Sequence, residues 1–294
     1  MQANFVLEIP QDLGSALDML ALESSAQVVA LAGGTNLIVD IRGRRQRPER
    51  VIGLSRVHEL RGISSDDENI VVGGRTTVSD LLNSPLIAAT APALASAARC
   101  FAGQMVRNTA TVAGNIACCS PAADLVPPLM SLDAQLTLAS KSGTRTVPLD
   151  EYFIGYKKTV RRHDELISRI SWRRPPENTA SHWYKLARRQ GDAITITGVA
   201  VALSVSGGIC TKARIALGAV APVVMRARNA ERMLEGNRIS PDMIDAAAAQ
   251  AVTECAPIDD IRASAEYRRH AVGVLTRRLV SRSWEQLTHA RTGG

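Results

Sequence analysis

Aromatic side chains are scarce in this chain, since Phe, Trp and Tyr together make up 3% of its 294 residues. Hydrophobic residues nevertheless reach 46%, so we expect one large or two modest domains with a core of small aliphatic side chains. The formal net charge is +7, but no stripe of basic residues carries interleaved aromatic rings. A surface for nucleic acids is therefore not expected, and the charge is assigned to solvated faces and partner contacts.

Cysteine is present, but in a pattern that excludes two kinds of site. The five cysteines are odd in number and show no C-x-x-C spacing: Cys100, Cys118, Cys119, Cys210 and Cys255. This pattern argues against a disulfide framework and a zinc site, and the adjacent pair is expected to be structural. No signal-peptide pattern stands at the N-terminus, and no apolar run approaches the ~18 residues of a membrane span. Together these absences predict a cytoplasmic protein without a membrane span.

Two familiar nucleotide-binding fingerprints are also missing, because neither G-x-G-x-x-G nor G-x-x-x-x-G-K-[ST] occurs. In their place, the short apolar run 28–32 ends in Gly33 and Gly34, and Thr35 or Asn36 can cap a following helix. Glycine lets the backbone approach a diphosphate closely. This stretch therefore predicts a strand–loop–helix unit that seats phosphates.

A second loop lies in the stretch 109–124. Thr111, Gly114 and Asn115 suit a tight turn, because Gly and Asn tolerate positive φ. Ser120-Pro121 is typical of a helix start, which places Asp124 in that helix's first turn. The same residues fit a strand, a turn and a helix without any ligand. Two such loops in one chain nevertheless suggest a dinucleotide held from two sides.

The order of these motifs resembles the FAD-binding middle subunit of the molybdenum hydroxylases, the family of xanthine oxidase and aerobic carbon monoxide dehydrogenase. The resemblance extends over nearly the whole chain. It rests on the segments Ala32–Leu37, Phe101-Ala102, Thr111–Asn115, Ser120–Asp124, Tyr184–Arg189, Ala216–Pro222 and Asp260–Arg268.

The resemblance implies a set of FAD contacts and no catalytic or metal-binding residue in this chain. Asp124 is expected to accept hydrogen bonds from ribityl or ribose hydroxyls, and Thr195 stands where xanthine oxidases carry a Lys. Ala113 replaces a family glycine, so either its φ is negative or the loop is rearranged. The implied contacts are Ala32, Gly33, Gly34, Thr35, Asn36, Leu37, Phe101, Ala102, Thr111, Ala113, Gly114, Asn115, Asp124, Lys185 and Thr195.

We expect an α+β fold with an FAD-binding domain over residues 1–175 and a smaller C-terminal domain over 176–290. The first domain divides into a βαβ subdomain (1–57) and a mixed or antiparallel sheet subdomain (58–175). The second is expected to hold a three-stranded antiparallel sheet with helices. Its strands are predicted at 182–189, 195–206 and 211–220, with a hairpin turn at Gly207-Gly208.

For function, the resemblance implies an FAD-carrying electron-transfer subunit. Its partners would be a small subunit with [2Fe–2S] clusters and a large molybdopterin subunit, in an (αβγ)2 assembly. Electrons would pass from the clusters through FAD to an external acceptor. The alternatives are a stand-alone FAD-dependent oxidoreductase of the vanillyl-alcohol-oxidase-like class and a non-enzymatic dinucleotide-sensing module. The sequence of this chain does not identify the substrate of the assembly or its electron acceptor.

Overall fold

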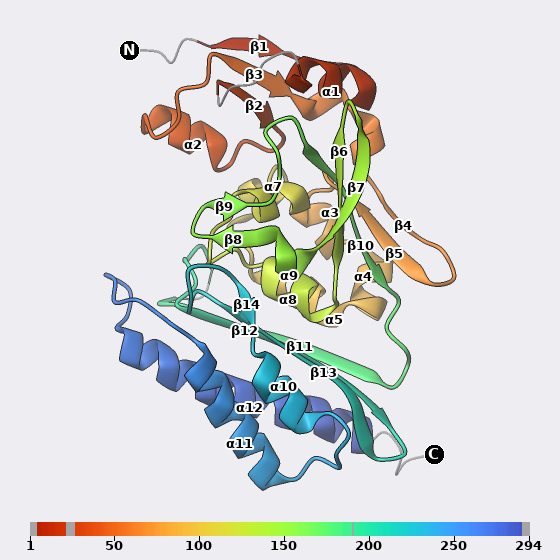
Figure 1. Cartoon of the computed structure of the whole chain (residues 1–294), viewed down its shortest axis with the longest axis vertical. Helices are drawn as coiled ribbons and strands as arrows, with labels where there is room; N and C mark the ends of the chain where they lie inside the picture. The colour runs from red at the N-terminus through yellow and green to blue at the C-terminus, as the bar shows by residue number, and fades with distance from the viewer. Residues whose placement is uncertain (1–4, 22–26, 190, 290–294) are drawn as a thin grey trace.

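The computed structural model describes residues 5–21, 27–189 and 191–289. Three parts follow one another along the long axis of the molecule, from the N-terminal sheet through a central sheet to the C-terminal sheet and its helices (Figure 1). No helix within these described residues is long and apolar enough to cross a membrane.

The N-terminal part is a small parallel sheet, as the sequence predicts. β3 lies between β1 and β2 and pairs in parallel with both. Helix α1 packs on the sheet through Ala16, Leu17 and Leu20. The elements are β1 (Val6–Glu8), α1 (Leu13–Ala21), β2 (Val28–Leu31), α2 (Leu37–Arg42) and β3 (Arg50–Gly53).

The central part is built on a five-stranded sheet in which every neighbouring pair is antiparallel. The strands lie in the order β4 (Ile63–Ser65), β5 (Asn69–Gly73), β10 (Leu166–Arg173), β6 (Gln135–Ser140) and β7 (Gly143–Pro148). A two-stranded sheet of β8 (Phe153–Gly155) and β9 (Lys158–Thr159) accompanies it. The helices are α3 (Val78–Leu82), α4 (Pro85–Thr90), α5 (Pro92–Cys100), α6 (Gln104–Arg107), α7 (Val112–Ala117), α8 (Val126–Ser131) and α9 (Leu149–Tyr152), with 3-10 turns at Leu54–Arg56 and His58–Leu60.

The C-terminal part contains a four-stranded antiparallel sheet, one strand more than expected. The added strand, β14, is only two residues long and pairs at the edge of β13. Gly207 and Gly208, with φ of 60° and 80°, form the predicted hairpin turn. The elements are β11 (Thr179–Leu186), β12 (Thr197–Ser206), β13 (Ile209–Gly218), β14 (Met225–Arg226), α10 (Arg228–Leu234), α11 (Pro241–Glu254) and α12 (Ala265–His289).

The two faces of this sheet serve different purposes. Val199 and Val201 pack with α10, α11 and α12, whereas Trp183 and Ala200 point at the core of the central part. Helices α5 and α8 cover that second face. Strand alternation sends neighbouring side chains to opposite faces, so β12 joins two cores at once.

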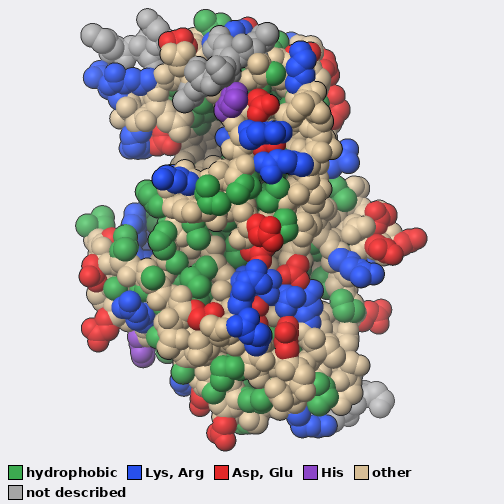
Figure 2. All heavy atoms as spheres, in the orientation of Figure 1, with side chains coloured by type: hydrophobic (Ala, Val, Ile, Leu, Met, Phe, Trp, Pro, Cys, Tyr) green, Lys and Arg blue, Asp and Glu red, His purple; other side chains and the backbone are tan. Residues whose placement is uncertain are grey.

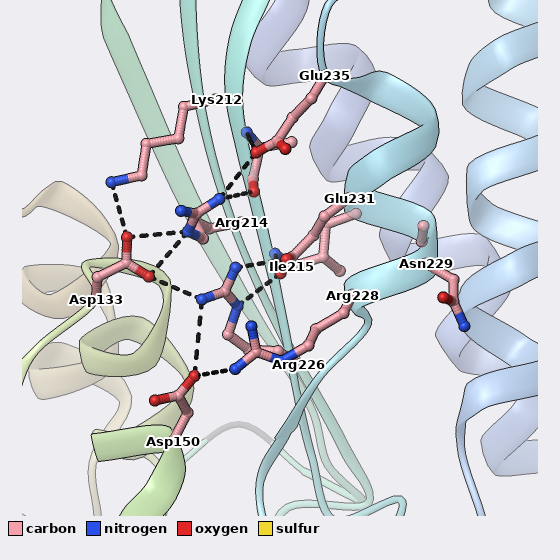
Figure 3. A network of polar contacts seen from close by, with 12 residues as sticks. Asp133, Asp150, Lys212, Arg214, Ile215, Arg226, Arg228, Asn229, Glu231 and Glu235 are labelled. Atoms are coloured by element: carbon pink, nitrogen blue, oxygen red, sulfur yellow. Dashed lines mark hydrogen bonds and ion pairs between the residues drawn. The ribbon is translucent and has the colours of Figure 1, made fainter. Parts of the chain in front are cut away.

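A charged network ties the central part to the C-terminal sheet (Figure 3). The Asp133 carboxylate accepts from Lys212 Nζ at 2.7 Å, Arg214 Nε at 2.8 Å and Arg226 Nη1 at 2.8 Å. Arg226 is 7% exposed and also donates to Glu231 at 2.5 Å. Figure 2 shows basic and acidic side chains gathered between α9 and α10. Because these charges are matched across the boundary, the network holds the two parts in one orientation.

Candidate cofactor site

The two loops predicted from the sequence touch each other. A Cβ on Gly33 would lie 1.8 Å from the carbonyl oxygen of Thr109, so only glycine permits the contact. Gly34 has φ +71°, a conformation that glycine adopts at little cost. The chain's own packing therefore requires Gly33, in addition to any need of a bound phosphate.

The second loop is helical rather than a tight turn, so that prediction was wrong. Thr111 is the N-cap of α7, and its Oγ1 accepts from the N–H of Gly114 at 3.1 Å. A Cβ on Gly114 would stand 2.8 Å from Thr111 Oγ1, so glycine here serves the cap and not a positive φ. Ala113 lies inside the helix and has no positive φ, which settles the question of its backbone.

The helix predicted at Ser120-Pro121 is also absent. Ser120 Oγ accepts from the N–H of Ala122 in a turn, and α8 begins at Val126. Asp124 therefore precedes the helix instead of standing in its first turn. Asn115 Oδ1 accepts from the N–H of Leu125 at 3.2 Å, which joins the end of α7 to the Asp124 segment.

The Phe101-Ala102 segment is shaped by an arginine that sequence reasoning did not single out. Arg107 Nη1 donates to the carbonyls of Phe101 at 2.9 Å and Ala102 at 2.6 Å, and Ala102 has φ +36°. A Cβ on Gly103 would lie 3.9 Å from the Asp192 carboxylate, so this segment meets the C-terminal part. A backbone held this way by a guanidinium has no signature in the sequence.

Two predicted residues from distant segments, Lys185 and Thr195, converge on a third, Asp124. Lys185 Nζ donates to Oδ2 at 2.6 Å, and Thr195 Oγ1 donates to Oδ1 at 2.5 Å. The side chains of Lys185 and Asp124 are only 9% and 10% exposed. Burial raises the pKa of Asp124, and the nearby Lys185 charge and the two hydrogen bonds offset this only in part.

The arrangement is better suited to holding a ligand than to attacking one. Burial raises the pKa of Cys118, whose thiol donates to the Asn115 carbonyl, so it is a poor nucleophile. Within the described ranges, no group of three or more His, Cys, Asp or Glu is placed to hold a metal ion. A hollow of about 350 Å³ elsewhere, between α11 and α12, contains none of the predicted site residues.

These features define a class: an α+β protein with two touching backbone loops and a buried carboxylate as a candidate cofactor site. The family model described as the FAD binding domain in molybdopterin dehydrogenase matches residues 3–172. The CO dehydrogenase flavoprotein C-terminal domain matches residues 182–283. The chain belongs to this family of FAD-binding subunits of molybdopterin dehydrogenases, which confirms the resemblance stated from its motifs.

Relatives of similar sequence agree with this assignment. The carbon monoxide dehydrogenase medium chain of Hydrogenophaga pseudoflava is 34% identical over 95% of this chain and 97% of its own. A putative xanthine dehydrogenase FAD-binding subunit of Escherichia coli K12 is 30% identical over 92% of each chain.

Solved structures agree as well. A chain of the H. pseudoflava carbon monoxide dehydrogenase superposes with a TM-score of 0.93 at 33% identity, covering 97% and 98% of the two chains. For quinoline 2-oxidoreductase from Pseudomonas putida 86 the TM-score is 0.90 at 28% identity, covering 98% and 99%. The chain is thus an FAD-binding subunit of an oxidoreductase, with the expected α+β fold.

Proposed function

We propose that this chain relays electrons within a molybdenum hydroxylase of three kinds of subunit. A small subunit with [2Fe–2S] clusters would deliver electrons to FAD here, and a large molybdopterin subunit would carry out substrate chemistry. The convergence of Asp124, Lys185 and Thr195, together with the contact between the two loops, supports this proposal. The relatives' names, medium chain and FAD-binding subunit, support a multi-subunit assembly, for which we infer an (αβγ)2 arrangement.

The first loop offers a test of whether FAD fits. The backbone N–H groups of Gly33, Gly34 and Thr35 have no hydrogen-bond partner among the described residues. Such free donors suit a diphosphate. Figure 2 shows this side of the molecule hollowed between the N-terminal part and the central part. The residues therefore fit the group.

Several of the remaining contacts would have a distinct task. Asp124 would accept from hydroxyls of FAD, while the nearby Lys185 charge favours the ionised form of its carboxylate against the effect of burial. Ala32, Asn36 and Leu37 would line the first loop, and Phe101 and Ala102 would present backbone groups set by Arg107. The complete set we propose is Ala32, Gly33, Gly34, Thr35, Asn36, Leu37, Phe101, Ala102, Thr111, Ala113, Gly114, Asn115, Asp124, Lys185 and Thr195.

Bound FAD supplies the redox chemistry, and the chain's own task is to bind it, orient it and exclude water from it. We further propose that the FAD-binding domain ends near residue 175, with subdomains 1–57 and 58–175, and that 176–290 is a separate domain. The Pro175-Pro176 linker and the gap between the two matched ranges support this division. The free thiols at all five cysteines are consistent with a cytoplasmic location.

Reconstitution tests the relay. The isolated FAD-loaded chain should turn over no small organic substrate, whereas addition of both partner subunits should restore substrate-dependent reduction of an external acceptor. Acid precipitation should release the flavin into the supernatant, because no His or Cys stands among the proposed contacts to tether it. Rapid substrate oxidation by the isolated chain would favour the stand-alone oxidoreductase instead.

A further inference from the structure

One face of the C-terminal sheet carries a set of side chains in register beside Asp124. Lys185 on β11 pairs with Gly198 on β12, and Trp183 pairs with Ala200. Directly opposed residues of antiparallel strands point to the same side of the sheet. Trp183 and Ala200 pack in the core of the central part, so Lys185 and Gly198 face that part as well.

Trp183 buries a polar atom that has no partner. Its side chain is 7% exposed, and Nε1 is buried without a hydrogen-bond acceptor in the part of the chain that the structure describes. An indole N–H can only donate, and leaving a buried donor unpaired is unfavourable. This donor lies 4.0 Å from the position that a Cβ on Gly198 would take.

Gly198 is a glycine that the chain's own packing does not require. Its φ is not positive, and a Cβ there would meet nothing nearer than Thr195 Cγ2 at 3.5 Å. Its neighbour in register, Gly218, is different, because a Cβ there would press on Pro127 Cγ at 3.1 Å. Glycine weakens a strand interior and often marks close approach of a ligand.

We propose that Trp183 and Gly198 belong to the cofactor site. Gly198 leaves room for an acceptor atom of FAD, an oxygen or a ring nitrogen, and Trp183 Nε1 donates a hydrogen bond to it. The acceptor then lies next to Thr195 and Lys185, the two groups that hold Asp124. This inference rests on the proposed function, because it extends the same site by two residues.

Trp183→Phe tests the donor, since it removes the N–H while keeping an aromatic ring. FAD is titrated into the deflavinated chain and followed by quenching of flavin fluorescence, and Tm is measured with and without FAD. We expect affinity to fall roughly five- to tenfold and the FAD-induced rise in Tm to shrink. The Tm of the FAD-free variant should not fall by a comparable amount, because the lost donor was unpaired.

Trp172→Phe is the matched control. Trp172 is also buried with an unpartnered Nε1 among the described residues, but it lies on β10 opposite Ile70 and is not one of the proposed contacts. We expect it to leave FAD affinity unchanged. An equal effect of both substitutions would overturn the inference, since it would reflect general loosening of the core.

Gly198→Ala tests the space without touching the donor. The added methyl group fits the FAD-free chain, so its Tm should stay the same or rise, while FAD affinity falls at least tenfold. Wild-type affinity in both Gly198→Ala and Trp183→Phe would show that Trp183 is served by an internal water, and would overturn the inference. Asp124→Ala distinguishes failure of this inference from failure of the proposed cofactor site. If Asp124→Ala also binds FAD like the wild type, the proposed cofactor site itself is wrong.

Discussion

Two aspartates flank the short helix α8, and both reach across to the C-terminal sheet, yet they meet very different partners. Asp133, after the helix, is bound by Lys212, Arg214 and Arg226. Asp124, before the helix, is bound by one cation, Lys185, and one hydroxyl.

The pKa values of the two carboxyls move in opposite directions. Burial favours the protonated form of Asp133, but hydrogen bonds and charges from Lys212 and Arg214 outweigh it and lower the pKa. At Asp124 burial outweighs its partners and raises the pKa. The chain thus satisfies Asp133 completely, whereas Asp124 would gain from further donors such as ligand hydroxyls. The first is an anchor between the two parts, and the second is suited to binding.

The largest effect is expected from Asp133→Ala. This substitution removes a carboxylate that binds three cationic side chains, one of which, Arg226, is almost fully buried. We expect the free energy of unfolding to fall by about 2–4 kcal/mol, measured by urea denaturation. FAD affinity at low temperature should change little, because no proposed cofactor contact is touched.

Asp245→Ala provides the control for this experiment. Asp245 pairs with Arg277 at 2.7 Å, but both side chains are more than half exposed. Surface pairs contribute little to stability. If Asp133→Ala were as mild as Asp245→Ala, the Asp133 network would not be an anchor.

Local patterns predicted much of the fold because their causes are local. Gly207-Gly208 turn the β12–β13 hairpin as predicted, because two glycines reach positive φ without any help from distant residues. The helix start predicted at Ser120-Pro121 was wrong because Ser120 also suits a turn. The helix α8 starts later, at Val126, and has Pro127 and Pro128 in its first turn. Proline is tolerated there, because the N–H groups of a first turn have no partner within the helix.

The site was harder to predict from residues alone. Asp124 meets Lys185 and Thr195 across 61 and 71 residues of chain, a distance over which no periodicity gives information. Only the family resemblance pointed to all three. Gly33 was noticed for its phosphate-binding capacity, but its contact with Thr109 depends on the packing of two loops and could not be read from either.

Asp124→Ala should give the second-largest effect, on FAD affinity. Loss of hydrogen bonds to a charged acceptor is worth about 1.5–3 kcal/mol, so we expect about 10- to 100-fold weaker binding in a fluorescence titration. The change also leaves Lys185 buried without its carboxylate.

The double variant Asp124→Ala/Lys185→Met removes that complication. It should recover stability lost in the single variant, because no charge remains buried, while FAD affinity stays low. Wild-type affinity in the double variant would show that Asp124 is only another anchor, like Asp133.

Thr195→Val should have a smaller effect, since it removes one neutral donor to Asp124 and keeps a similar volume. We expect FAD affinity to fall by about 1 kcal/mol, a factor of about five, with Thr195→Ser close to the wild type. The same titration measures both. Equal losses in the two variants would point to the methyl group of Thr195 and not to its hydroxyl.

The smallest effect, and the sharpest test of the comparison, is the dependence of stability on pH in the FAD-free chain. The folded Asp124 has a raised pKa, so between 3.8 and that pKa the folded state binds more protons than the unfolded state. The free energy of unfolding, relative to that of Asp124→Asn, should therefore rise as pH falls through this window.

Asp133 has a lowered pKa, so its contribution to stability is complete above pH 3.8 and is lost as pH falls below 3.8. The difference in free energy of unfolding between the wild type and Asp133→Asn should therefore shrink as the pH falls. For both aspartates, this difference should change by less than about 1.4 kcal/mol per pH unit. Urea denaturation at several pH values gives both differences, and slopes of the same sign would mean that the two aspartates do not differ in the way their surroundings imply.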